Sequence, residues 1–328
     1  MDIDGLAFFT AGLALLIIGA EFLVRGATRL ALSLGVKPLL LGLTVVAIGT
    51  STPELAVGIT ASWEGSGALA VGNIAGTNMV NILFIMGLSA LLRPLPLHLQ
   101  TIKLDLPMMI AASALMTILA WNGILSRVDG GVMLCAAVLY TVALIRMASR
   151  ESQAVKDEFQ DMFGADVSKT RPTVARIRAV SAALLAGGMV LSALGAHWLV
   201  AGAVDIARRL GASEALIGLT IVAIGTSGPE LVTTIISTIR NERDVAIGNL
   251  LGSSIYNILV ILGITCLVSP AGIPVERQLL FVDIPLMTGV ALLCVPVFIT
   301  GRLVSRFEGG VFVAMYLGYL ASLAYIRI

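Results

Sequence analysis

Two segments of the chain are nearly the same: residues 42–54 read GLTVVAIGTSTPE, and residues 218–230 read GLTIVAIGTSGPE. Eleven of the thirteen positions are identical at an offset of 176 residues. The same offset aligns residues 72–73 with 248–249 and residues 81–83 with 257–259. Self-similarity at a fixed spacing indicates internal duplication. The chain is therefore predicted to consist of two homologous halves.

The composition is that of a membrane protein. The 328 residues are 58% hydrophobic and 12% charged, whereas soluble domains carry about 25% charged residues. The apolar residues form blocks long enough to cross a bilayer, which takes roughly 20 helical residues. The net charge is +1 and no charged block is long, which excludes a nucleic-acid-binding arm. We expect the lipid bilayer as a partner, and the sequence leaves the oligomeric state open.

Ten apolar segments are predicted to be transmembrane helices, separated by short connectors rich in Gly, Pro or charge. They cover residues 6–33, 38–63, 68–92, 103–121, 128–148, 178–207, 214–239, 245–268, 279–300 and 307–326. The predicted fold is an all-α polytopic membrane protein. Its parts are an N-terminal five-helix repeat (1–148), a polar cytoplasmic linker (149–177) and a C-terminal five-helix repeat (178–328).

The number of spans sets the orientation of the two halves. Each half has five predicted spans, an odd number, so the second half must enter the membrane in the opposite sense. With the N-terminus outside, inward-facing ends carry all but five of the 21 Lys and Arg residues, as the positive-inside rule requires. The five exceptions are Arg127, Arg208, Arg209, Arg277 and Arg327. The sequence thus predicts inverted repeats with both termini outside.

Glu54 and Glu230 stand out as acidic residues deep within predicted spans, each in the second span of its half. A charge near the bilayer centre costs about 2.5–3.5 kcal/mol. Two such charges at matched positions need a cation, a proton or a water-filled cavity. We therefore interpret the pair as a functional site.

A proline directly precedes each glutamate. Pro53 and Pro229 lack an N–H, so the carbonyl four residues earlier loses its helical partner. We expect each second span to divide into two half-helices, with carbonyl oxygens near Ala47 and Thr50 free to bind a cation.

Hydroxyl residues flank the expected break. Ser51 or Thr52 is expected to cap the second half-helix of the N-terminal repeat. In the C-terminal repeat Gly228 replaces Thr52, which leaves Ser227 as the expected cap.

The third span of each half carries a polar stripe. Asn73, Thr77 and Asn81 are spaced four residues apart and so share one helix face. The matching residues of the second half are Asn249, Ser253 and Asn257. Such a stripe is typical either of hydrogen bonds between packed helices or of ion ligands. We include all six residues, Asn73 and Asn249 among them, in the set of candidate ligands.

The candidate site offers only oxygen ligands: two carboxylates, hydroxyls, amide oxygens and carbonyls. Oxygen ligation suits Ca²⁺ or Na⁺ and disfavours Zn²⁺ and copper. The three cysteines are isolated in apolar stretches, without the spacing of a metal site. No cofactor is predicted besides the transported ions.

Residues 38–92 and 214–268 closely resemble the alpha repeats of the sodium/calcium exchanger branch of the cation/calcium exchanger superfamily. The motifs that carry the resemblance are GTSxPE and, in the next span, GNxxG[ST]xxxNIL. The resemblance implies a bacterial inner-membrane antiporter, not an enzyme, that exchanges Ca²⁺ for Na⁺ or H⁺ by alternating access, and we take Na⁺ as the expected counter-ion. It also implies that the first and sixth spans slide across the remaining helices.

The resemblance further implies a role for each matching residue. Glu54 and Glu230 would hold the central Ca²⁺, with help from the carbonyls of Thr50 and Thr226. Asn81 and Asn257 would complete the central ring. The positions matching flanking Na⁺ sites are Ala47, Ser51, Thr77, Ala223, Ser227, Ser253 and Ser254.

One departure leaves the driving ion open. Some sodium/calcium exchangers have Asp at one of the two central Asn positions, whereas both are Asn here. A Ca²⁺/H⁺ antiporter is therefore the alternative, since protons and cations compete for carboxylates. A passive cation channel and an intramembrane enzyme are weaker alternatives. The sequence shows no nucleophile–base pair of the kind that such an enzyme would need.

Four other polar residues in the spans are assigned no ion-binding role. Glu21 and His197 occupy equivalent places in the first and sixth spans. Their unequal chemistry favours interhelical or interfacial roles, and lining an access path is the alternative. Asp105 and Asp283 each stand two residues before a proline near a span start. Helix capping is the expected role of these two aspartates.

Overall fold

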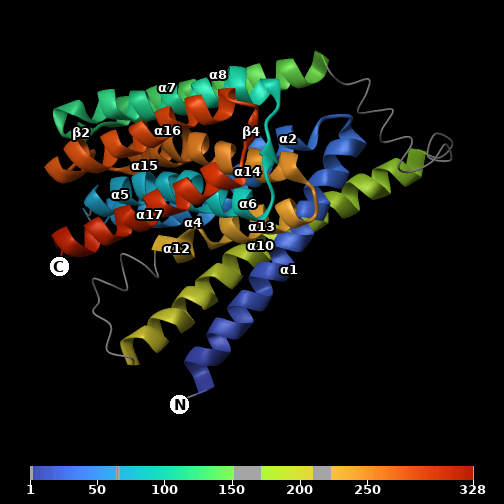
Figure 1. The fold of residues 1–328 in the computed structure, drawn as a ribbon, viewed down its shortest axis with the longest axis horizontal. Coiled ribbons are helices and arrows are strands. Elements are labelled where there is room, and N and C mark those ends of the chain that lie inside the picture. Colours follow the sequence, from blue (N-terminus) through green and yellow to red (C-terminus); the bar gives the residue numbers. More distant parts are fainter. Residues whose placement is uncertain (1–2, 64, 66, 151–170, 210–222, 328) are drawn as a thin grey trace.

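A computed structural model describes residues 3–63, 65, 67–150, 171–209 and 223–327. Nearly all of these residues are helical (Figure 1). In the first half the helices are α1 (Ile3–Leu34), α2 (Pro38–Leu41), η1 (Gly42–Val46), α3 (Ala47–Thr50), α4 (Thr52–Trp63), α5 (Gly67–Met79), η2 (Val80–Met86), α6 (Gly87–Leu92), η3 (Thr101–Asp105), α7 (Leu106–Leu119), η4 (Ala120–Asn122) and α8 (Arg127–Arg150).

The second half contains a similar series. Its helices are α10 (Arg171–Arg209), α12 (Ala223–Thr226), α13 (Gly228–Ile239), α14 (Arg243–Tyr256), η7 (Asn257–Leu262), α15 (Gly263–Val268), η8 (Leu279–Asp283), α16 (Ile284–Ile299) and α17 (Arg306–Arg327). Helix α10 begins seven residues earlier than the predicted sixth span, inside the segment expected to be a linker. Residues 149–150 of the predicted linker belong to the end of α8, and residues 151–170 lie outside the described residues.

Seven helical runs among the described residues are long and apolar enough to cross a membrane, and a bent pair gives an eighth. The bent pair is Pro38–Thr50 and Thr52–Trp63, with an angle of 42° between its members. Large side chains such as Leu139, 72% exposed, face outward from these runs, as expected for contact with lipid. The chain is thus a helical membrane protein. Residues 214–222 of the predicted seventh span lie outside the described residues.

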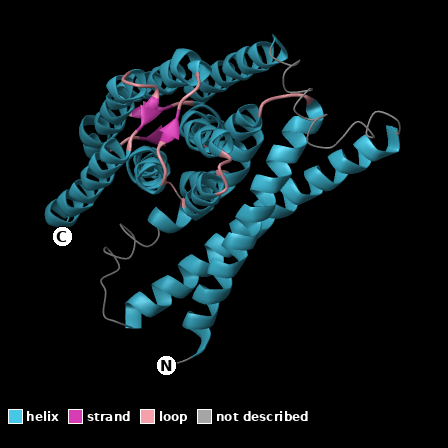
Figure 2. Cartoon of the chain, turned by 45° about the vertical axis from the view of Figure 1, so that its right-hand side comes forward, coloured by secondary structure: helices cyan, strands magenta, loops and turns pink. Residues whose placement is uncertain are grey.

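Helices α1 and α10 lie side by side along most of their length, apart from the bundle formed by the other helices (Figures 1 and 2). Their backbones touch at glycines. A Cβ atom on Gly19 would lie 2.6 Å from the backbone nitrogen of Ser192, and one on Gly188 would lie 2.5 Å from that of Leu23. Real Cβ atoms do not approach so closely, so this contact requires glycine.

The main hydrophobic core belongs to the bundle and not to the α1–α10 pair. A large cluster of buried side chains joins helices of the bundle, and none of its described members lies on α1 or α10. A small second cluster joins Leu23 and Ala27 of α1 and Leu185 of α10 to Val46 of the bundle. The α1–α10 pair is therefore packed tightly within itself, and among the described residues the buried cluster that it shares with the bundle is small.

Two short strand pairs connect the halves crosswise. Strand β1 (Leu95–Pro96) pairs with β4 (Leu303–Val304), and β2 (Ile124–Leu125) pairs with β3 (Ile273–Pro274). Strands β1 and β3 hold matching places in the two halves, and so do β2 and β4. Each pair therefore joins the connector after the predicted third span of one half to the connector after the predicted fourth span of the other.

Candidate functional site

The two glutamates lie at matching helix starts inside the bundle. Glu54 is the third residue of α4 and Glu230 is the third residue of α13, and both side chains are fully buried. The N-terminal turn of a helix carries partial positive charge, which favours a carboxylate there. Their side chains are also close enough to interact electrostatically.

The predicted break in the second span is present in the first half. Helix α3 ends at Thr50, Ser51 leaves helical geometry with φ −82° and ψ 11°, and α4 begins at Thr52. The Gly49 carbonyl, which Pro53 deprives of its usual partner, instead accepts a 2.8 Å hydrogen bond from the Thr52 hydroxyl. The Thr52 hydroxyl thus replaces the missing backbone donor to the Gly49 carbonyl.

The second half has the same break with different chemistry. Ser227 has the same backbone angles as Ser51 and precedes α13. Gly228 supplies no hydroxyl to match that of Thr52. Ser227 makes no side-chain capping hydrogen bond. In the first half, the Ser51 hydroxyl donates to Glu230 and the Thr52 hydroxyl donates to the Gly49 carbonyl. The prediction that Ser227 caps its helix is therefore wrong.

The broken helix of the first half contacts side chains of the second half. The Ser51 hydroxyl donates to Oε1 of Glu230 over 3.2 Å. The Thr50 hydroxyl donates to Oδ1 of Asn249 over 3.1 Å and lies 3.5 Å from the Ser253 hydroxyl. The structure thus brings predicted residues of both halves into one buried polar region.

The Ala47 carbonyl differs from expectation. It accepts from the backbone N–H of Ser51 at 3.2 Å, from the Thr50 hydroxyl at 3.3 Å and from the Ser253 hydroxyl at 3.4 Å. The prediction that the carbonyl near Ala47 is freed by the break is therefore wrong. The carbonyl keeps its helical donor, the Ser51 N–H, and nearby hydroxyls add further contacts.

Several other buried polar atoms of this region form no hydrogen bond within the described part of the chain. Leaving such a group unsatisfied costs about 1–3 kcal/mol, and native proteins rarely do so. A cation would supply a partner to the oxygens among them. The atoms are Oε1 and Oε2 of Glu54, Oε2 of Glu230, Nδ2 and Oδ1 of Asn81 and of Asn257, Nδ2 of Asn73, and the hydroxyls of Ser227 and Ser254.

The remaining candidate ligands differ in burial and in their positions in the helices. Thr77 is buried, whereas Asn73 and Thr226 are half-buried. Ala223 begins α12, and its side chain lies outside the described structure. Asn81 lies in the π-helical segment η2, and Asn257 begins η7. Short π-helical turns are frequent at functional sites.

One buried residue beside the site was missed from the sequence. Thr234 follows Glu230 by one turn of α13, is fully buried, and accepts a 3.1 Å hydrogen bond from Nδ2 of Asn249. Its position four residues after Glu230 puts it on the same helix face, and this spacing is the signal that could have revealed it.

Three other acidic residues lie outside this region. Glu21 forms ion pairs with Arg25 of its own helix and with Arg240, which joins α1 to the end of α13. Asp105 accepts from the Tyr140 hydroxyl at 3.0 Å, and Asp283 accepts from Tyr319 at 3.1 Å. Neither aspartate makes a side-chain cap, so the capping prediction is wrong for both.

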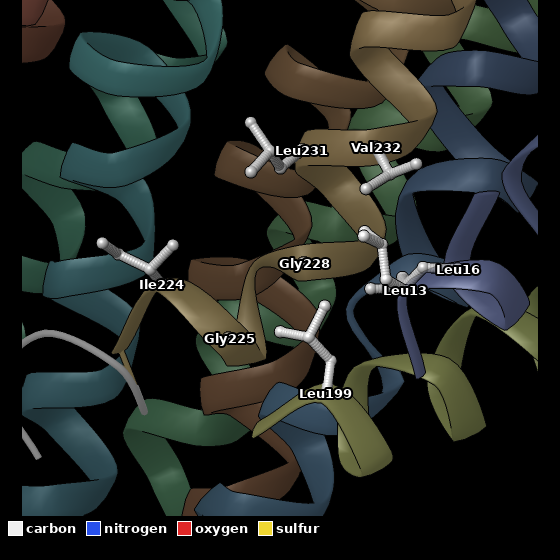
Figure 3. A pocket seen from close by; sticks show the side chains of 8 residues that line it. All are labelled: Leu13, Leu16, Leu199, Ile224, Gly225, Gly228, Leu231 and Val232. Carbon is white, nitrogen blue, oxygen red and sulfur yellow. The ribbon is translucent and has the colours of Figure 1, made fainter. Parts of the chain in front are cut away.

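A cavity of about 320 Å³ lies between the α1–α10 pair and the broken helix of the second half (Figure 3). Leu13, Leu16 and Leu199 line it from the pair, and Gly228 lines it two residues before Glu230. Its lining is apolar, so the cavity borders the polar region but does not contain the carboxylates.

Comparison with known proteins identifies the family. The model of the family described as sodium/calcium exchanger protein matches residues 5–146 and 180–325. The chain belongs to the sodium/calcium exchanger family. It is therefore a membrane transporter of the cation/Ca²⁺ exchange type, in agreement with the resemblance noted from the sequence.

Relatives similar to this exchanger cover most of its length. The sodium/calcium exchanger MaX1 of Methanosarcina acetivorans is 32% identical over 341 residues, covering 96% of this chain and 97% of that protein. The inner membrane protein YrbG of Escherichia coli is 35% identical over 272 residues, covering 81% of each chain. Among solved structures, the sodium-calcium exchanger NCX_Mj matches with a TM-score of 0.82 and 29% identity, covering 98% of this chain and 99% of that one.

Proposed function

We propose that this exchanger is a secondary-active antiporter that moves Ca²⁺ against Na⁺ by alternating access, with ions bound between the two halves at Glu54 and Glu230. One observation carries the proposal. Two fully buried glutamates lie at matching helix breaks, among buried oxygens that form no hydrogen bond within the described residues. MaX1 and NCX_Mj, both named sodium/calcium exchangers, support the choice of ions.

The donor set fits Ca²⁺ as cargo. Ca²⁺ takes six to eight oxygen ligands, and two carboxylates would neutralise its charge. The proposed central ligands are the side chains of Glu54, Glu230, Asn81 and Asn257 and the carbonyls of Thr50 and Thr226. The proposed ligands for flanking ions are Ser51, Ser227, Ala47, Ala223, Thr77, Ser253, Ser254, Asn73 and Asn249. The Ala47 carbonyl already has three hydrogen-bond contacts. It would have to lose at least one of them to bind an ion.

Several findings support two inverted five-span repeats, 1–148 and 178–328, joined by a cytoplasmic linker. The family model matches one segment in each half. The crosswise strand pairs join the connector after the third span to the connector after the ninth, and the connector after the fourth to that after the eighth. In an inverted ten-span arrangement each of these pairs lies on one side of the membrane. Parallel repeats would separate them.

We further propose that both termini lie outside a bacterial inner membrane. The distribution of Lys and Arg supports this orientation, and the printed name of the relative YrbG supports the location.

The α1–α10 pair is the proposed moving part. Its glycine contacts let the two helices move as one body, and among the described residues the buried cluster that joins the pair to the bundle is small. The apolar cavity beside Gly228 lies along the surface over which the pair would slide. Sliding would expose the polar region to one side of the membrane at a time.

Uptake of ⁴⁵Ca²⁺ into proteoliposomes under separately imposed gradients tests the proposed function. An outward Na⁺ gradient should drive uptake, and a pH gradient without Na⁺ should not. Uptake that follows only the pH gradient would establish the Ca²⁺/H⁺ antiporter instead. Flux that needs neither counter-ion would indicate a passive channel.

A further inference from the structure

Thr234 joins the two halves of the polar region through a chain of hydrogen bonds. Nδ2 of Asn249 donates to the Thr234 hydroxyl oxygen over 3.1 Å, and Oδ1 of Asn249 accepts from the Thr50 hydroxyl over 3.1 Å. All three side chains are almost completely buried. The chain of contacts runs from α13 through α14 to the end of α3, and so crosses from one half to the other.

The direction of this chain follows from the chemistry of its acceptors. Nδ2 of Asn249 also lies 3.5 Å from the backbone carbonyl of Glu230, which can only accept a hydrogen bond. The amide nitrogen must therefore face α13, and the amide oxygen must face Thr50. Thr50 in turn must be the donor in its contact with Asn249.

This direction of hydrogen bonding leaves the Thr50 hydroxyl oxygen able to bind a cation. A hydroxyl has one proton, which the contact with Oδ1 of Asn249 uses. The Ala47 carbonyl at 3.3 Å, the Ser253 hydroxyl at 3.5 Å and the Glu230 carboxylate also lie beside this hydroxyl. With its proton used there, the hydroxyl keeps its lone pairs for a cation. The same contacts hold Thr50, the last residue of α3, in place at the helix break.

We propose that Thr234 is a positioning residue, which through Asn249 fixes Thr50 and its oxygens in the geometry that a Ca²⁺ ion requires. This inference rests on the proposed function. Thr234 itself touches no cation in this account.

The other half lacks the same tie. Gly58 occupies the position that matches Thr234, and Nδ2 of Asn73, the match of Asn249, forms no hydrogen bond within the described residues. A Cβ at position 58 would lie 2.7 Å from the Thr265 hydroxyl, so a threonine would not fit without movement. Among the described residues, the hydrogen bond from α13 to the matching asparagine is thus present in one half of the site only.

The test compares Ca²⁺ binding by purified protein in nanodiscs, measured with ⁴⁵Ca²⁺ without Na⁺. Thr234→Val keeps the shape of the side chain but removes the hydroxyl, so affinity should fall about five- to tenfold. Thr234→Ser keeps the hydroxyl and should bind like the wild type. Thr238→Val is the matched control, because Thr238 is equally buried on the same helix but donates only to the Thr234 carbonyl. Thr234→Ala replaces the valine variant if that variant does not fold.

A second comparison separates positioning from packing. In a Thr50→Val background there is no hydroxyl to orient, so Thr234→Val should weaken binding no further. Full additivity of the two changes would overturn the inference. So would a Thr234→Val protein that binds like Thr238→Val, or a Thr234→Ser protein as weak as the valine variant.

Failure of the proposed function gives a different pattern. If the wild type binds no Ca²⁺, or Glu54→Gln binds as well as the wild type, the proposed site is wrong and the role of Thr234 falls with it. If Glu54→Gln loses binding but both Thr234→Val and Thr238→Val bind normally, only the role of Thr234 is rejected.

Discussion

Glu54 and Glu230 occupy matching positions but have different surroundings. Ser51 donates to one oxygen of Glu230, whereas neither carboxylate oxygen of Glu54 has a partner in the described structure. An unsatisfied buried carboxylate is costly, so Glu54 gains more from a bound cation. At the scale of single residues, the two halves of the site are therefore similar in composition and unequal in hydrogen bonding.

The central asparagines give a prediction about pH. Asn81 does not titrate, whereas an aspartate there must lose its proton before it can bind a cation. Ca²⁺ affinity of Asn81→Asp should therefore fall more steeply than that of the wild type as the pH is lowered. The measurement is ⁴⁵Ca²⁺ binding across a pH series.

The control for this variant is Asn122→Asp, which adds the same charge at an exposed connector. It should follow the wild-type pH curve. An Asn81→Asp curve that coincides with the control would show that Asn81 does not share the cation with the glutamates.

Duplication made most of the site visible in the sequence. Glu54, Asn81 and their counterparts were found because each occurs twice at one offset. Thr234 was missed because its counterpart is Gly58, and comparing repeats favours residues present in both. The contact between the Ala47 carbonyl and the Ser253 hydroxyl could not be predicted either, because Ser253 is distant in sequence.

At the scale of elements, a proline accounts for the break in each second span, and in the first half a nearby hydroxyl donates to the carbonyl that the proline leaves without a partner. Proline inside a helix costs about 3 kcal/mol, and the motif places one at residue 53 and another at residue 229. The sequence predicted the break for this reason. It did not predict the bond from Thr52 to the Gly49 carbonyl, because a threonine at a helix start can also act as a cap.

Two adjacent glycines of α10 test the close contact with α1. A Cβ on Gly188 would lie 2.5 Å from the Leu23 backbone, whereas one on Gly187 would meet nothing within 4 Å. Gly188→Ala should lower the stability by about 1–3 kcal/mol through overpacking and slow Ca²⁺ uptake. Thermal unfolding in detergent and the proteoliposome assay measure the two effects.

Gly187→Ala is the matched control, since it makes the same helix-favouring change one position away. It should leave stability and uptake close to the wild-type values. Equal behaviour of the two alanine variants would contradict close packing of α1 against α10.

At the scale of the whole molecule, the separation of the α1–α10 pair from the bundle is the main feature. The sequence predicted the spans and the duplication, because hydropathy and repeats are local patterns. It could not predict from residues alone that α1 packs on α10, since glycines spaced along two distant helices do not identify their partners. The crosswise strand pairs likewise join residues more than a hundred positions apart.

The central claim is that one Ca²⁺ is held jointly by Glu54 and Glu230, one from each half. Equilibrium ⁴⁵Ca²⁺ binding to the purified wild type, Glu54→Gln and Glu230→Gln, each shown to be folded, tests this claim most directly. The account predicts saturable binding by the wild type, and a loss of at least about a hundredfold in affinity in either variant, because each removes one of two charges that neutralise the ion. Wild-type affinity in either single variant would contradict it.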